Sequence, residues 1–308
     1  LHFIQSFNKL LPKPIQEKLV NSSAKETPYM GFVVEPYATF LCYEIEDMEW
    51  AKKLLPDGFQ LIKSKVFDDD DPKYICIFGC FTSHTSAFWG SRVEFYIIAE
   101  DTKTGLLSWI IVDYDSNTIS YDKRDGLRDP NAHNAVVTTD CEGKIYVDVK
   151  KNDGGRELVF DCDFESGKFG PLDQRLWLEG NLSIGYGSEF DGKDASIFSL
   201  KFNPCEVRRG VNIPLESVNV SSNSWYPGLF KEMPFRVLSF PYAQHFVSDS
   251  PGSSSNLKNE EELVEAVESI DFDSIKVFST KSFKTMFLVG SIVSFLITTV
   301  LIVLLVVS

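Results

Sequence analysis

The residues best equipped for chemistry crowd into one short segment, YDKRDGLRDPNAH at positions 121–133. It follows directly on an apolar, β-prone run and combines charged residues of both signs with a glycine, a proline and a histidine. Gly and Pro together with Asp and Asn are typical of a solvated turn between two strands. Loops are also where binding and catalytic residues concentrate. The segment is therefore either a surface turn or the rim of a site.

Standard catalytic and nucleotide-binding motifs are absent from the sequence. There is no H-E-x-x-H, no paired C-x-x-C, no phosphate-binding loop and no G-x-S-x-G elbow. The glycine-rich GYGSEFDG (185–192) lacks the strand–turn–helix setting that a phosphate loop needs. The histidines are isolated in sequence, and they are His2, His84, His133 and His245. We therefore expect no metal site and no cofactor.

The charge balance excludes one class of partner. The formal net charge is −14 and the sequence pI is about 4.8, so the chain lacks the clustered Lys and Arg that nucleic-acid binding requires. The same balance argues against a broad electrostatic attachment to anionic lipid. The six cysteines are spread along the chain, which favours buried free thiols in a reducing compartment over a disulfide framework.

The elements that must position the chemical groups are mostly strands. Short segments rich in aromatic and β-branched residues are separated by Gly, Asp, Asn and Pro. TKTG (102–105), CEGK (141–144) and KNDGGRE (151–157) are typical of hairpin turns. One helix is expected in DMEWAKKLLP, capped by Asp47 and ended by Pro56. The pattern predicts a mostly β (α+β) fold, namely a closed antiparallel β-barrel or cone with a few peripheral helices.

A second strong signal lies at the C-terminal end of the sequence. The run 286–307 has no charged residue and is long enough to cross a hydrocarbon core of about 30 Å as a helix. Lys276, Lys281 and Lys284 precede it, so the positive-inside rule places the large N-terminal domain on the cytoplasmic side. We expect a single-pass tail anchor, with the membrane as a partner through residues 286–307.

The chain divides into four predicted parts. Residues 1–28 form an N-terminal helical segment, and residues 29–247 form the β domain. Residues 248–284 combine a Ser- and Gly-rich flexible linker with a short acidic stalk helix. Residues 285–308 form the transmembrane anchor. The stalk could dock on a membrane-protein partner, although a solvated or domain-packed helix is the commoner case.

The order of segments in the β domain resembles the acetoacetate decarboxylase-like superfamily. ATFLCYEIEDMEWAKKLLPDGFQLI (38–62) supplies a strand, a helix and a Leu-Pro-x-Gly-Phe turn into the next strand. WGSRVEFYIIAEDTKTGLLSWIIVDYDSNTISYDKRDGLRDP (89–130) then supplies a glutamate-bearing strand, its hairpin partner and the position of a Gly-x-Pro segment. The resemblance covers roughly residues 35–240 and implies a closed β-barrel or cone around an apolar cavity.

The same resemblance implies a chemistry that this sequence only partly retains. In decarboxylating members a lysine amine forms a Schiff base with a β-keto acid, and the iminium accepts electrons as CO₂ leaves. The amine has to be neutral, so its pKa must be lowered by apolar surroundings and a neighbouring cation. Where the superfamily has a lysine pair, this chain has Asn131 and Ala132. The nearest lysine, Lys123, is flanked by Arg124 and by two aspartates that favour its charged form.

The glutamate of the superfamily does carry over, because Glu94 in GSRVEFY matches its setting. Arg92 is two residues earlier, so the two side chains share one face of a strand. The commoner alternatives are an ion pair between strands on the outside of the barrel and a solvated turn at Lys123. The candidate catalytic residues are Glu94, Arg92 and Lys123, and the candidates for ligand binding in an aromatic-lined pocket are His84, Trp89 and His133.

Three functions fit these residues. The first is a membrane-tethered, non-catalytic barrel that binds a small apolar or carboxylate ligand or serves a membrane complex, which the missing lysines and the anchor favour. The second is an active carbon–carbon lyase or other carbonyl-directed enzyme that uses Glu94 with His84 or His133 in acid–base roles. The third is a structural adaptor in which the barrel is a rigid spacer. We rank them in this order and leave enzymatic activity open, with a preference for none.

Overall fold

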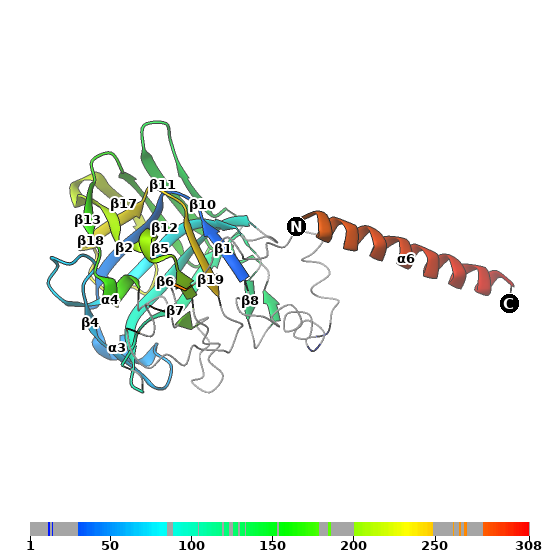
Figure 1. Cartoon of the computed structure of the whole chain (residues 1–308), viewed down its shortest axis with the longest axis horizontal. Coiled ribbons are helices and arrows are strands. Elements are labelled where there is room, and N and C mark those ends of the chain that lie inside the picture. Colours follow the sequence, from blue (N-terminus) through cyan, green and yellow to red (C-terminus); the bar gives the residue numbers. More distant parts are fainter. Residues whose placement is uncertain are drawn as a thin grey trace.

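Strands dominate the structure of the chain (Figure 1). The computed structural model describes residues 30–84, 89–103, 105–118, 120–122, 126–128, 130–132, 134–152, 154–178, 184–185, 200–248 and 280–307, together with a few isolated positions. The predicted N-terminal helical segment, linker and acidic stalk therefore lie almost wholly outside the described residues.

A 13-stranded sheet forms the body of the domain. At its centre the long strand β5 (Lys73–His84) pairs antiparallel with β6 (Trp89–Asp101) along one edge. The other edge of β5 pairs with β2 (Ala38–Glu44) and, toward its end, with β1 (Met30–Val34). The remaining strands of this large sheet are β3 (Phe59–Leu61), β4 (Lys63–Ser64), β7 (Leu107–Ser116), β13 (Lys168–Pro171), β14 (Ile184–Gly185), β15 (Leu200–Phe202), β16 (Arg209–Ile213), β18 (Arg236–Phe240) and β19 (Gln244–Ser248).

The large sheet divides into two branches because β1 and β2 pair with different parts of the same edge of β5. One branch runs β2–β18–β16–β13, and the other runs β1–β19–β15. On the opposite side of β5 the order is β6–β7–β14, with β14 parallel to β7. The strands that the structure describes do not close on themselves. The mostly β fold is thus confirmed, while closure into a barrel stays a prediction.

A second, four-stranded sheet packs over part of the large one, in the order β10–β11–β12–β17. Its strands are β10 (Val136–Thr139), β11 (Lys144–Lys150), β12 (Glu157–Asp163) and β17 (Val218–Asn223). β11 alternates buried Ile145, Val147 and Val149 with more exposed residues, as a strand with one covered face does. Gly143 and Gly154 have φ of +82° and +72°, which glycine tolerates in hairpin turns. The predicted turns at these two places are confirmed.

The described residues of the segment 121–133 begin in a small two-stranded sheet. β8 (Ser120–Asp122) pairs antiparallel with β9 (Gly126–Arg128). Lys123, between these two strands in the sequence, and His133 lie outside the described residues.

Helices are few in the described part of the globular domain. The predicted helix is confirmed as α3 (Met48–Lys53), and its N-cap Asp47 accepts a 2.8 Å hydrogen bond from the Trp50 amide. The described residues also contain the short α4 (Gln174–Trp177) and the 3₁₀ turns η2 (Pro204–Val207) and η3 (Leu215–Ser217). The long helix α6 (Thr280–Val307) follows the globular domain in the sequence.

The two faces of the large sheet bury two separate apolar clusters. The inter-sheet core lies between the large and the four-stranded sheet and includes Tyr43, Phe78, Phe95, Phe160 and Trp225. The aromatic core lies on the other face and includes Phe40, Tyr96, Trp109, Trp177 and Phe240. Side chains alternate along each strand, so successive residues of β5, β6 and β7 enter different cores. This division decides what each candidate residue can contact.

The cysteines of the chain are free thiols. Four of them, Cys42, Cys76, Cys80 and Cys162, are buried as expected. Cys141 and Cys205 are exposed, so the expectation of buried thiols is wrong for these two. The reason is local, because Cys141 lies in the turn before β11 and Cys205 in the 3₁₀ turn η2, so neither belongs to a strand.

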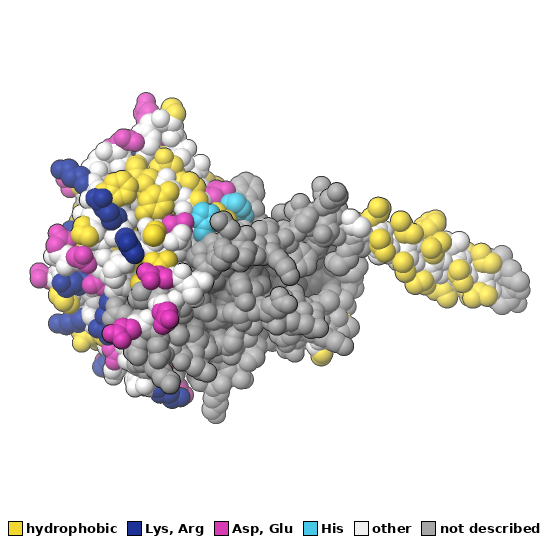
Figure 2. Space-filling view, in the orientation of Figure 1, with side chains coloured by type: hydrophobic (Ala, Val, Ile, Leu, Met, Phe, Trp, Pro, Cys, Tyr) yellow, Lys and Arg dark blue, Asp and Glu magenta, His cyan; other side chains and the backbone are white. Residues whose placement is uncertain are grey.

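Helix α6 carries the predicted membrane anchor. Its segment Phe287–Leu305 is 19 residues long, and no part of it is buried against the rest of the chain. Among the described residues it is the one helix long and apolar enough to cross a membrane. Figure 2 shows apolar side chains along the visible face of this helix. An apolar helix without a protein covering is what a lipid environment accommodates.

Candidate functional site

The candidate site is a row of three side chains on β6. Arg92, Glu94 and Tyr96 are spaced two residues apart, so they project from the same face of the strand. Tyr96 belongs to the aromatic core, which places the whole row on that side of the large sheet. In the neighbouring strands, Glu94 lies opposite Gly79 of β5 and Tyr114 of β7.

Direct polar contacts join the row. Arg92 Nη2 lies 2.6 Å from Glu94 Oε1, and the Tyr96 hydroxyl donates a hydrogen bond to Glu94 Oε2. The guanidinium carbon of Arg92 lies 4.9 Å from the centre of the Tyr114 ring, which is a cation–π contact. The Arg92 and Glu94 side chains are only 7% and 8% exposed. The ion pair is therefore buried at the edge of the aromatic core.

This arrangement overturns the alternative of an ion pair between strands on the outside of the domain. Arg92 and Glu94 pair along one strand, and both are buried. The sequence placed them correctly on one face but did not say which face is covered, since alternation alone does not distinguish the two sides of a strand.

Gly79 makes room for the aromatic residues beside Glu94. A Cβ atom at this position would come within 3.0 Å of both the Phe40 ring and the Tyr96 ring. Because Gly79 is directly opposite Glu94, the missing side chain lets Tyr96 lie close enough to hydrogen-bond the carboxylate. Beyond it, Phe40 contacts Trp109 edge to face, with ring centres 6.1 Å apart.

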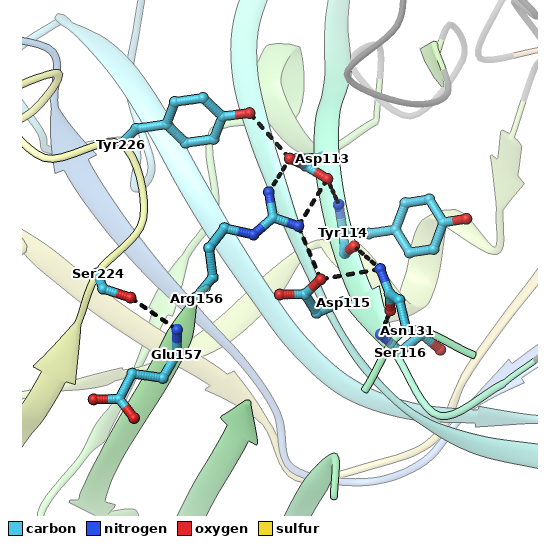
Figure 3. Close-up of polar contacts among 9 residues, drawn as sticks. All are labelled: Asp113, Tyr114, Asp115, Ser116, Asn131, Arg156, Glu157, Ser224 and Tyr226. Atoms are coloured by element: carbon cyan, nitrogen blue, oxygen red, sulfur yellow. Dashed lines mark hydrogen bonds and ion pairs between the residues drawn. The ribbon is translucent and has the colours of Figure 1, made fainter. Parts of the chain in front are cut away.

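A second polar cluster lies on the opposite face of β7 (Figure 3). The Arg156 guanidinium forms ion pairs with Asp113 and with Asp115, the second through Nη2 at 2.9 Å from Asp115 Oδ1. The Tyr226 hydroxyl donates to Asp113 Oδ2 at 3.1 Å. Asp113 and Asp115 come from β7, Arg156 immediately precedes β12, and Tyr226 lies in the segment after β17. The cluster therefore ties the four-stranded sheet to the large sheet.

Burial changes the acid–base behaviour of this second cluster. It raises the pKa of the Asp115 carboxyl above its ordinary value, and the nearby Arg156 charge offsets only part of that effect. Burial and the negative charge of Asp113 together raise the pKa of the Tyr226 hydroxyl. Tyr226 also has a positive φ of 41°, unusual for a residue with a side chain. Both its backbone and its hydroxyl are thus held by the surrounding structure.

The two positions at which the resemblance places lysines have structural contacts instead. Asn131 Nδ2 donates to the Tyr114 carbonyl at 2.9 Å and to Asp115 Oδ1 at 3.0 Å, and Asn131 Oδ1 accepts from the Ser116 amide at 2.7 Å. Ala132 is fully buried in the inter-sheet core. Both residues therefore lie on the face of β7 that is turned away from Glu94.

The structure does not bring His84 together with Glu94. His84 projects from the face of β5 opposite to the one that Gly79 shares with Glu94, and its side chain is 42% exposed. Its Nε2 lies 3.9 Å from Glu35 Oε1. Trp89 begins β6, but its side chain, like Lys123 and His133, lies outside the described residues.

Sequence reasoning missed the cluster around Arg156. The signal that could have found it is the pair Asp113 and Asp115 at the end of an otherwise apolar strand. Carboxylates two residues apart share a face, and burial would demand a cation for them. Arg156, however, is 41 residues further along the chain than Asp115, and sequence alone does not show that the two meet.

No cation site is apparent in the described part of the chain. There, no group of three His, Cys, Asp or Glu side chains is arranged to hold a metal ion. The two buried clusters each contain an arginine whose charge already faces the carboxylates.

Comparisons with known proteins find structural similarity at low sequence identity. No protein-family description matches the chain, and no curated protein matches it. Among solved structures, acetoacetate decarboxylase from Legionella pneumophila is similar over 72% of this chain and 86% of its own, with 11% identity and a TM-score of 0.46. The enduracididine biosynthesis enzyme MppR has 10% identity and a TM-score of 0.38, over 72% of this chain and 86% of its own.

A third solved structure is an acetoacetate decarboxylase-like enzyme from Sphingomonas wittichii. It has 9% identity and a TM-score of 0.39, over 72% of this chain and 91% of its own. Two of the three structures thus carry the name of the superfamily that the sequence resembles. At these identities and TM-scores, no activity, substrate or site residue is transferred to this chain.

Proposed function

We propose that this chain is a membrane-tethered, non-catalytic binding domain for a small ligand with an apolar body and a carboxylate group. The observation that carries the proposal is the ion pair of Arg92 and Glu94, buried beside the aromatic core. Desolvation offsets most of the attraction in a buried ion pair, so such a pair adds little stability. A buried guanidinium presents planar N–H donors that match a carboxylate, and aromatic residues suit the apolar part of a ligand.

Two observations support binding over Schiff-base chemistry. Asn131 and Ala132 are engaged in packing and hydrogen bonding on the other face of β7. None of the lysine side chains that the structure describes is buried. A lysine that attacks a carbonyl has to be neutral at working pH, which requires burial or a neighbouring cation. In this reading Glu94 holds Arg92 in place and does not transfer a proton.

The proposal includes two features of the whole chain. The first is a closed cone around the aromatic face of the large sheet. The second is a single membrane crossing by α6 with the globular domain on the cytoplasmic side, supported by Lys281 and Lys284 just before the apolar segment. A membrane-protein partner would then meet the domain at the membrane surface.

The test compares an acid with its neutral isostere. Full-length protein in detergent is titrated by calorimetry with phenylacetate and with phenylacetamide, which differ in charge and not in shape. We expect phenylacetate to bind more tightly, and Arg92→Met to abolish this preference. Arg175→Met is the matched control, because the Arg175 side chain is 46% exposed and pairs with Glu100 outside the site.

Two outcomes favour the other functions. Protein mixed with acetoacetate and reduced with borohydride should show no mass increase; an adduct on any lysine would instead indicate an active decarboxylase-like enzyme. If wild-type protein binds the acid no better than the amide, the ligand proposal is wrong, and a structural adaptor becomes the better description.

A further inference from the structure

The Asn131 side chain hydrogen-bonds to the backbone of β7, and the Tyr114 ring of this strand lies against the Arg92 guanidinium. We propose that Asn131 is a positioning residue: it fixes the backbone of Tyr114, and the Tyr114 ring in turn orients the Arg92 guanidinium. The inference rests on the proposed function of Arg92. It gives a role to the residue that stands where the resemblance places a lysine.

The backbone of Tyr114 is held on both sides by side chains. Its amide donates to Asp113 Oδ1 at 2.9 Å, and its carbonyl accepts from Asn131 Nδ2 at 2.9 Å (Figure 3). The next backbone group is held as well, because the Ser116 amide donates to Asn131 Oδ1 at 2.7 Å. One asparagine side chain thus joins two residues at the end of β7.

The ring of Tyr114 projects to the other face of the strand. Tyr114 lies opposite Glu94 in the pairing of β6 with β7, and its ring centre is 4.9 Å from the Arg92 guanidinium carbon. In a strand the side-chain direction follows from the backbone, since successive residues alternate between faces. A shift of the Tyr114 backbone therefore moves the ring against which Arg92 lies.

Asn131 is itself fixed by its surroundings. The amides of Asn131 and Ala132 both donate to the Ser116 carbonyl, at 3.1 and 3.0 Å. Asn131 Nδ2 also donates to Asp115 Oδ1, which Arg156 Nη2 holds at 2.9 Å. The Asp115 side chain is 1% exposed, so water competes little for these contacts.

The chemistry of the contact requires an amide side chain. Asn131 donates through Nδ2 and accepts through Oδ1 at the same time. An ionised carboxylate only accepts and an ammonium only donates. Neither Asp nor Lys at this position therefore reproduces both contacts, and Asp would add a negative charge beside Asp115.

The first test measures the ratio of phenylacetate affinity to phenylacetamide affinity. General destabilisation lowers the binding of both compounds equally and leaves this ratio unchanged. In Asn131→Ala and Asn131→Asp, we expect the ratio of phenylacetate to phenylacetamide affinity to fall about tenfold, a change of about 1.4 kcal/mol, with the amide affinity kept. Asn219→Ala is the matched control, since Asn219 is hydrogen-bonded to Asp161 in the four-stranded sheet. An unchanged ratio, or an equal loss for both compounds, would overturn the inference.

The second test needs no ligand and separates this inference from the proposed function. The free energies of unfolding of Asn131→Ala, Arg92→Met and the double variant form a double-mutant cycle. Coupled residues give a non-additive double variant, whereas independent distant sites add. We expect non-additivity; additive effects would overturn the positioning role. Coupling without any acid preference in wild-type protein would leave the positioning role standing and refute only the ligand.

Discussion

Arg92 and Glu94 are each tolerated in the core of the domain because the other is present. Their side chains are almost completely buried, and one contact of 2.6 Å joins the two charges. Glu94 has a further partner in the Tyr96 hydroxyl. Removing one charge leaves the other buried and unpaired, which costs far more than removing both.

The stability of single and paired variants tests this statement at the residue scale. We expect Arg92→Met and Glu94→Gln each to lower the free energy of unfolding by about 3–5 kcal/mol, the usual cost of breaking a buried pair. The combined variant should recover most of the lost stability. The carbonyl oxygen of the introduced glutamine can still accept a hydrogen bond from the Tyr96 hydroxyl, and no unpaired charge remains. Urea denaturation measures all three. Losses that simply add would show that the two charges do not interact.

β6 and β7 are the elements that carry the candidate site. Their pairing places the row of Arg92, Glu94 and Tyr96 on one face and the Arg156 cluster on the other, with a register shift between Phe95 and Tyr96. In the part of β6 that precedes the shift, Glu94 lies opposite Tyr114 and Arg92 lies opposite Ser116, and these side chains face the aromatic core. The Arg156 cluster and the candidate site therefore share the backbone of one strand pair.

Substitution of Gly79 tests how closely β5 packs beside β6 and β7. Gly79→Ala would bring a methyl group within 3.0 Å of the Phe40 and Tyr96 rings. We expect a loss of about 1–3 kcal/mol in unfolding free energy, as for other overpacked cores, and weaker phenylacetate binding. Adding Phe40→Leu should restore part of both by freeing space. Gly210→Ala is the control, since its Cβ would meet flexible leucine side chains at 3.2 Å or more. A Gly79→Ala protein as stable as the wild type would refute the packing argument.

Local pattern predicted much of the element structure but not the contacts between elements. The cap of α3, the hairpin glycines and the shared face of Arg92 and Glu94 all follow from short-range rules. The covered side of β6 does not, because alternation is symmetric between the two faces. The role of Asn131 also escaped, since its partner Ser116 in β7 is 15 residues away and the contact depends on tertiary packing.

At the scale of the whole molecule, the core buries thiol and hydroxyl groups whose pKa values are raised, while the apolar helix α6 is not buried. Burial raises the pKa of the Cys42, Cys76 and Cys80 thiols well above the ordinary value of 9.0. Burial together with Asp113 raises the pKa of the Tyr226 hydroxyl above 10.0. In each case the folded chain keeps a proton that the unfolded chain loses.

These shifts predict how stability depends on pH. A group whose pKa is higher in the folded state contributes stability that is complete below its unfolded pKa and is lost as the pH rises above it. The loss should therefore begin at about pH 9 for the thiols and about pH 10 for Tyr226. We expect a lower urea midpoint at about pH 10.5 than at about pH 8, with a smaller decrease in Tyr226→Phe. An unchanged midpoint would contradict the burial of these groups.

The proposed membrane attachment is tested at the same scale, through the apolar segment of α6. We expect Val293→Arg combined with Ile297→Arg to release the protein from membranes, because each arginine at the centre of a spanning helix costs about 2.5–3.5 kcal/mol on insertion scales. Alkaline carbonate extraction of cell membranes measures the release. Ser308→Arg, beyond the apolar segment, should stay in the membrane fraction. Retention of the doubly substituted protein would show that α6 is not the anchor.

The most direct test of the binding proposal is phenylacetate titration of the Arg92→Met/Glu94→Gln variant beside the wild type, at equal folded fraction. The account predicts that the wild-type chain prefers phenylacetate to phenylacetamide, and that the variant folds with nearly unchanged stability but shows no preference between them. A wild-type chain without the preference, or a variant that keeps it, would contradict the assignment of this buried pair as the ligand site.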